Sequence, residues 1–142
     1  MKPIDYMKQV AKAERDMNML KAMLQHWEDI GLTITPNNSG MPGKKGAGSR
    51  VEAAAIGMVD LECDLRAKID DFSRLVNEAR EFIEKIPQAR YRAILSLKYL
   101  SGWSWGSISD ELHYKDRNSV YRAHGWALKE LGRVMENAGK HP

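Results

Sequence analysis

The sequence predicts an all-α protein: a long antiparallel helical hairpin, or coiled-coil arm, followed by a C-terminal three-helix domain. Two stretches, 4–30 and 50–86, carry a seven-residue apolar repeat, and a Gly- and Pro-containing segment separates them. After residue 86 the long repeat gives way to three shorter helical patterns. The 142-residue length fits one ordinary domain or two very small ones. We therefore expect an arm over 1–86 and a separate domain over 87–142.

The first helix of the arm is predicted over residues 4–30. Apolar or small residues recur there at alternating steps of four and three, which is the spacing of a coiled-coil seam. Pro3 precedes them, at a position that the first turn of a helix tolerates. The seam residues are Tyr6, Val10, Ala13, Met17, Leu20, Leu24 and Trp27.

The second arm helix, predicted over 50–86, follows the same repeat more strictly. Only Glu62 interrupts the apolar seam, and Pro87 is expected to end the helix at the preceding residue. At 1.5 Å per residue this stretch would be about 55 Å long, more than the diameter of a small domain. We expect it to pair with 4–30, and a dimer formed through the same helices is also expected. The seam residues are Val51, Ala55, Met58, Glu62, Leu65, Ile69, Phe72, Val76, Ala79, Ile83 and Ile86.

Residues 31–49 are predicted to be a loop. They contain 5 of the 11 glycines and 2 of the 5 prolines, and neither helical nor strand periodicity continues through them. The segment GKKGAGS resembles a phosphate-binding loop only superficially, because Asn38 and Lys45 occupy positions where that motif has Gly and Ser or Thr. A weak, nonspecific contact of Lys44 and Lys45 with DNA is the remaining functional interpretation.

Several functional classes are disfavoured by composition. No apolar run approaches the roughly 20 residues of a membrane span, and residues 1–6 do not resemble an export signal. The single Cys63 cannot form an internal disulfide, so we expect a reducing cytoplasm. The histidines and Cys63 lack the spacing of metal ligands, and no nucleophile has a supporting base. We expect no enzyme activity, no metal and no cofactor.

The C-terminal segment is predicted to contain three helices. The first covers about 88–100 and ends at Ser101-Gly102; the second begins after Ser104, a good N-cap residue. A brief turn over 113–116 leads into a third helix from about Arg117 to Asn137. A short helix, a tight turn and a longer helix form the helix-turn-helix layout, whose second helix enters the DNA major groove.

The start of the third helix carries side chains suited to reading DNA. Arg pairs with guanine, Asn with adenine, and Ser or Tyr with phosphates or base edges; lysines at either end suit phosphates. The charge distribution agrees, because 87–142 hold nine basic and five acidic residues whereas 50–86 hold six and nine. The alternative is a three-helix bundle whose polar face contacts only solvent. His124 is expected either to contact a phosphate or to pack on the bundle. The predicted DNA-binding residues are Lys115, Arg117, Asn118, Ser119, Tyr121, Arg122 and Lys129.

Two stretches of this segment resemble known DNA-binding proteins. They read KYLSGWSWGSISDELHY and VYRAHGWALKEL. They are similar to region 4 of bacterial sigma factors and, more closely, to phage-encoded late transcription regulators of the ArpU/RinA type. The resemblance implies that Arg117, Asn118, Tyr121 and Arg122 contact a promoter element. It places Ile108, Leu112, Tyr114, Val120, Ala127 and Leu128 in the core.

One departure from the family pattern concerns the turn. Five residues separate Tyr114 from Val120, where the family usually has four. The additional residue either lengthens the turn or shifts the start of the third helix.

The expected function is therefore a cytoplasmic, sequence-specific regulator of late phage or prophage genes that binds double-stranded DNA beside or through RNA polymerase. A second hypothesis is a small terminase-like packaging subunit, which would assemble as a closed ring rather than a dimer. A third is a helical protein–protein adaptor that does not bind DNA.

Overall fold

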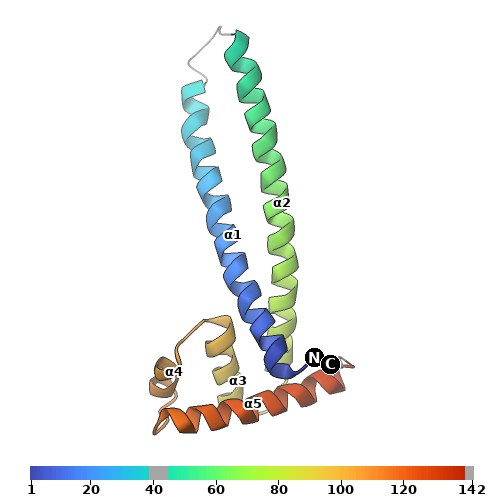
Figure 1. Cartoon of the computed structure of the whole chain (residues 1–142), viewed down its shortest axis with the longest axis vertical. Helices are drawn as coiled ribbons and strands as arrows, with labels where there is room; N and C mark the ends of the chain where they lie inside the picture. The colour runs from blue at the N-terminus through green and yellow to red at the C-terminus, as the bar shows by residue number, and fades with distance from the viewer. Residues whose placement is uncertain (39–44, 140–142) are drawn as a thin grey trace. The chain divides into compact units, whose positions relative to one another are not determined.

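The computed structural model describes the backbone of residues 1–38 and 45–139, and the side chains of residues 1–30 and 59–139. Throughout these backbone ranges the regular secondary structure is helical, and no strand occurs in them. The predicted all-α fold class is confirmed. Figure 1 shows the order of the helices along the chain.

Two long helices account for more than half of the chain. Helix α1 spans Pro3–Asn38 and α2 spans Lys45–Glu84. The predicted loop over 31–49 is wrong at both ends, because α1 continues to Asn38 and α2 already begins at Lys45. Residues 39–44, including Lys44, lie outside the described residues. Glycine and proline lower helix propensity, but propensity is a weak guide near the end of a long helix.

The chain divides into two compact units, and the division cuts through both long helices. One unit comprises Met1–Arg15 and Ser73–Pro142, and the other comprises Asp16–Phe72. We call the first the base and the second the arm. The division differs from the domain boundary predicted after residue 86. The reason is that the beginning of α1 and the end of α2 pack in the same unit as the C-terminal helices.

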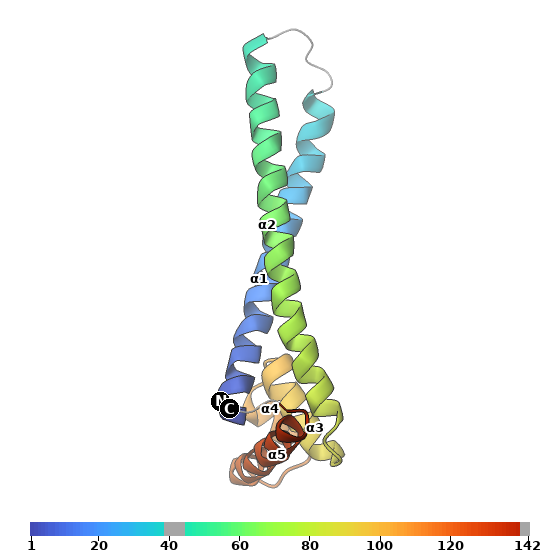
Figure 2. The same cartoon turned by 90° about the vertical axis from the view of Figure 1, so that its right-hand side faces the viewer.

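The arm consists of the later part of α1 and the earlier part of α2, which run antiparallel (Figures 1 and 2). Arg66 of α2 joins them, because its Nη2 lies 3.0 Å from Glu28 Oε1 of α1 and 2.8 Å from Glu62 Oε1. The described seam residues that are buried in the arm are Met17, Leu24 and Leu65. Trp27, also predicted on the seam, is 37% exposed. The seam is therefore closed along only part of the arm.

In the base, the same seam is closed. Val10, Val76 and Ile83 are at most 3% exposed. The Tyr6 hydroxyl donates a 2.7 Å hydrogen bond to Glu78 Oε1, and the Tyr6 and Phe82 rings lie 5.9 Å apart. Burial, and then the Glu78 carboxylate, raise the pKa of Tyr6 above its usual range.

Three further helices follow in the base. Helix α3 spans Ala89–Leu95 and continues as a single π-helical segment, η1, over Ser96–Leu100. Helix α4 spans Trp105–Glu111 and α5 spans Arg117–Asn137. These bounds agree with the predicted helices, although no sequence pattern indicated the π-helical segment. A buried cluster joins α3, α4 and α5, and its members are Ile94, Ile108, Val120 and Ala123.

The connections between these helices are formed by local hydrogen bonds. Gly102, at φ +72°, lies in the left-handed region just after η1, and the Ser104 side chain accepts from the Ser107 N–H at the start of α4. After α4, His113 has φ 58°. There the Tyr114 N–H donates to the Ser109 carbonyl and the His113 N–H to the Asp110 carbonyl, which is a Schellman ending.

Candidate nucleic-acid interface

Helix α5 has one buried face and one exposed face. The buried side chains recur at steps of three and four, which keeps one side of the helix against the base. They are Val120, Ala123, Ala127, Leu131 and Met135. The opposite face is consequently directed outward from α5.

The first turn of α5 is held by Asp116. Its Oδ1 accepts from the Ser119 N–H at 2.8 Å and from the Ser119 hydroxyl at 2.9 Å. These hydrogen bonds lower the pKa of Asp116, and the positive charge of Arg122 lowers it further. Ser119, predicted to contact DNA, is half-buried, and both its N–H and its hydroxyl donate to Asp116 in this cap. Helix α5 therefore begins at Arg117.

A cationic stripe lies on the exposed face of α5, and we define it as Asn118, Arg122 and Lys129. All three side chains are exposed. Their spacing of four and seven residues keeps them on one side of the helix, over about 16 Å of its length. From Arg117 to Lys129 the sequence has no acidic residue. The stripe thus offers an amide and two cations with no neighbouring carboxylate on the same stretch of α5.

Tyr121 lies beside the stripe. It is 44% exposed, and its ring meets that of Trp105 edge to face at 5.5 Å and 89°. The ammonium of Lys98 lies 4.7 Å from the centre of the Trp105 ring. Tyr121 is therefore oriented by α4 while its outer edge stays open to solvent.

The other predicted basic residues near the start of α5 are placed differently. Lys115 is exposed in the turn before the helix. Arg117 is exposed but packs on α4: a Cβ atom at Gly106 would approach the Arg117 Nη2 atom to 3.3 Å. At 100° per residue, Arg117 lies about 100° around the helix from Asn118. The structure thus separates Arg117 and Ser119 from the three residues of the stripe.

His124 packs inside the bundle. Its Nε2 lies 2.7 Å from the Tyr99 hydroxyl, and its ring centre lies 5.7 Å from that of Tyr99 and 4.7 Å from that of Trp105. Burial, and then the nearby charge of Lys98, lower the pKa of His124. The residue links η1, α4 and α5. Of the two interpretations of His124, the structure shows packing.

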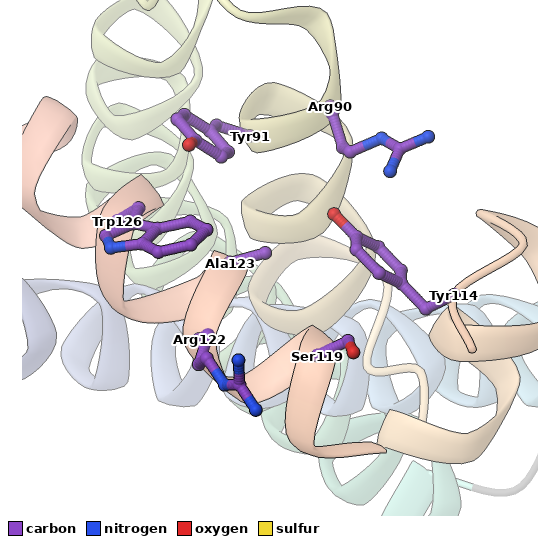
Figure 3. Close-up of a pocket in the computed structure, with 7 residues that line it drawn as sticks. All are labelled: Arg90, Tyr91, Tyr114, Ser119, Arg122, Ala123 and Trp126. Atoms are coloured by element: carbon purple, nitrogen blue, oxygen red, sulfur yellow. The ribbon is translucent and has the colours of Figure 1, made fainter. Parts of the chain in front are cut away.

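A groove of about 260 Å³ opens beside the stripe, between α3 and α5 (Figure 3). Of the residues that line this groove, only Ser119 and Arg122 were predicted from the sequence to bind DNA. Trp126, 52% exposed, could have been found because it lies four residues after Arg122 on the same helix. Arg90 could not have been found from the sequence, because it belongs to no recognisable motif. The groove is lined by Arg90, Tyr91, Tyr114, Ser119, Arg122, Ala123 and Trp126.

Neither a metal site nor a membrane span occurs in the described part of the chain. Within it, no cluster of three or more His, Cys, Asp or Glu side chains could hold a metal ion. None of the helices, as far as they are described, is long and apolar enough to span a membrane. Cys63 is exposed.

Comparison of the chain with known protein families, with curated proteins and with solved structures found no match in any of the three. The interpretation of the site therefore depends on its geometry and chemistry.

Proposed function

We propose that the protein is a sequence-specific DNA-binding regulator of phage or prophage late genes, acting at a promoter together with RNA polymerase in the bacterial cytoplasm. The observation that carries the DNA-binding part is the exposed cationic stripe of α5, opposite a face that is buried in the base. The B-DNA major groove is wide enough to admit an α-helix. The regulatory part depends on the resemblance of about residues 87–134 to the sigma-like regulators.

Within this proposal the residues of the stripe have different roles. Arg122 pairs with a guanine and Asn118 with an adenine, because their side chains match the donor and acceptor patterns of those bases. Lys129, about 10 Å farther along α5 than Arg122, neutralises a phosphate. Tyr121 contacts a base edge or a phosphate from beside the stripe, and Lys115 approaches the backbone from the turn.

The test is to replace Arg122 by alanine. Duplexes that the full chain selects from a random pool would first be isolated, and affinity for the selected and a scrambled duplex then measured by fluorescence anisotropy. We expect Arg122→Ala to weaken binding to the selected duplex by about 1–3 kcal/mol and to relax the preference at one base pair.

Arg133→Ala is the matched control. It removes the same charge from the same helix, but Arg133 is engaged by Glu130, with Nη1 lying 2.6 Å from Oε1. We expect little loss of sequence preference in this variant. Unchanged affinity of Arg122→Ala for the selected duplex would refute the proposed reading helix.

We further propose that the protein is a dimer formed through its N-terminal helices. In the arm, Met19, Met23 and Trp27 of α1 are exposed at spacings of four residues and thus share one side of that helix. Mass measurement in solution tests this part. A dimer supports the regulator, a closed ring of many subunits favours the packaging alternative, and absence of any salt-dependent duplex binding favours the adaptor.

A further inference from the structure

We propose that the groove between α3 and α5 seats one stretch of the DNA sugar–phosphate backbone, with Arg90 holding a phosphate at its outer rim. This inference deepens the proposed function and rests on it. It assigns a role to Arg90, Tyr114 and Trp126, none of which belongs to the base-reading stripe.

The groove combines aromatic walls with a cation on each of two sides. Figure 3 shows the Trp126 and Tyr114 rings on either side of Ala123, with Arg90 at the α3 edge and Arg122 at the α5 edge. None of the residues that line the groove is acidic. A sugar–phosphate chain is complementary to such a groove, because its apolar sugar faces alternate with anionic phosphates.

Arg90 is held in position by an aromatic ring rather than by a carboxylate. Its guanidinium carbon lies 4.8 Å from the centre of the Tyr114 ring, which is within the range of a cation–π interaction. Over the described residues, no ion pair joins Arg90 to an acidic side chain. The guanidinium is therefore oriented and keeps its charge available for an anion. Guanidinium groups bind phosphate oxygens through strong, charge-assisted hydrogen bonds.

The Tyr114 hydroxyl adds an unsatisfied donor. It is buried and has no hydrogen-bond partner among the described residues. Burying an unpaired hydroxyl costs free energy, and a movement of the Tyr114 side chain toward the groove would let a phosphate oxygen supply the missing acceptor. The ring of the same residue supports Arg90, so the two donors belong to one local unit.

The position of the groove favours the backbone of a duplex over a free nucleotide. Arg122 belongs to the stripe and also lines the groove between α3 and α5. If α5 inserts into the DNA major groove, this groove of the protein therefore lies beside the duplex. Phosphates border the major groove, and contacts to them position a protein without reading sequence.

The experiment measures the affinity of the full chain for a nonspecific duplex across a series of salt concentrations. We expect Arg90→Ala to reduce the slope of log K against log salt by about 0.9, the value for one phosphate contact. Affinity for selected and scrambled duplexes should fall by the same factor. Trp126→Ala should lower both affinities and leave the slope unchanged, because it removes contact area without charge.

Two further variants complete the test. Tyr114→Phe, which keeps the ring under Arg90 and removes only the hydroxyl, should weaken binding to both duplexes equally. Arg133→Ala is the control for loss of a cation that is already paired with a carboxylate, that of Glu130, and it should leave the slope nearly unchanged. Circular dichroism would verify that every variant keeps the helix content of the parent chain.

Three outcomes would overturn the inference: an unchanged salt slope in Arg90→Ala, a loss confined to the selected duplex, or submillimolar binding of a free nucleotide. The last would be followed by NMR shifts of the Trp126 indole in titrations with inorganic phosphate and with a deoxynucleoside monophosphate. A parent chain that binds duplexes without preference would refute the proposed sequence-specific function alone. The salt-slope comparison would still decide the role of the groove.

Discussion

The arm and the base use the same seven-residue repeat, yet they bury their side chains to very different degrees. Among the described side chains, the arm has three buried apolar residues, Met17, Leu24 and Leu65, and every other buried apolar residue belongs to the base. Met19 and Val59 of the arm are 62% and 56% exposed. The physical reason is geometrical: two paired helices can cover a single seam, whereas additional helices shield a side chain from several directions.

From this contrast we expect the two units to differ both in their stability and in the kind of surface that they expose. The base has the packing to hold α5 rigidly, so an exposed stripe on α5 can keep a defined geometry. The arm leaves apolar surface available for another chain.

The largest effect is expected from removing side-chain volume in the base. Ile108 is fully buried in the cluster that joins α3, α4 and α5. Ile108→Ala should lower the free energy of unfolding by about 2–5 kcal/mol, measured by urea denaturation. Leu65→Ala, at a position 4% exposed in the arm, should cost less because its two-helix surroundings can collapse or admit water. Equal losses in the two variants would contradict the proposed difference between the units.

A smaller loss is expected from removing the cap of α5. Asp116→Ala should destabilise the base by about 0.5–2 kcal/mol, because the Ser119 N–H loses its acceptor. Asp116→Asn is the control, since asparagine caps helices about as well as aspartate. If both variants lost the same stability, charge rather than the cap hydrogen bond would be responsible.

The packing of His124 predicts that the stability of the base depends on pH. Burial lowers the pKa of His124 below its ordinary value of 6.5, so the unfolded chain binds more protons than the folded chain as the pH falls. Stability should therefore be constant above about pH 6.5 and decrease below it. Urea midpoints between pH 7.5 and 5 would show this decrease. His124→Gln should reduce it, and an undiminished decrease in that variant would assign it to other groups.

The smallest effect is expected in the arm. Arg66 links Glu28 and Glu62, but the side chains are 56% and 39% exposed in both pairs. Arg66→Ala should therefore change the free energy of unfolding by less than about 1 kcal/mol, and the difference should shrink further in high salt. A loss comparable to that of Ile108→Ala would mean that the arm is a larger source of stability than its packing indicates.

Local sequence signals were sufficient for much of the fold. The seam repeat predicted both long helices, and the capping signals at Gly102 and Ser104 matched the structure closely. The loop prediction failed at its edges, because Gly and Pro lower helix propensity without forbidding a helix. The π-helical segment over Ser96–Leu100 had no sequence signal, since it depends on how that turn packs.

The candidate site was predictable to a lesser extent. The spacing of Asn118, Arg122 and Lys129 already placed them on one side of a helix, and the structure leaves all three exposed. Ser119 and Arg117 were expected beside them, but the cap and the contact with α4 hold these two residues elsewhere. Whether any of these side chains contacts DNA stays a prediction.

By itself, the sequence determined the helical class, the seam of the arm and the outward direction of the stripe, because each follows from periodicity within one helix. Only the tertiary structure decided which residues meet across helices. It brought Arg90 of α3 over Tyr114 and placed both beside Trp126 of α5. Contacts of this kind join residues far apart in the chain, and local spacing carries no information about them.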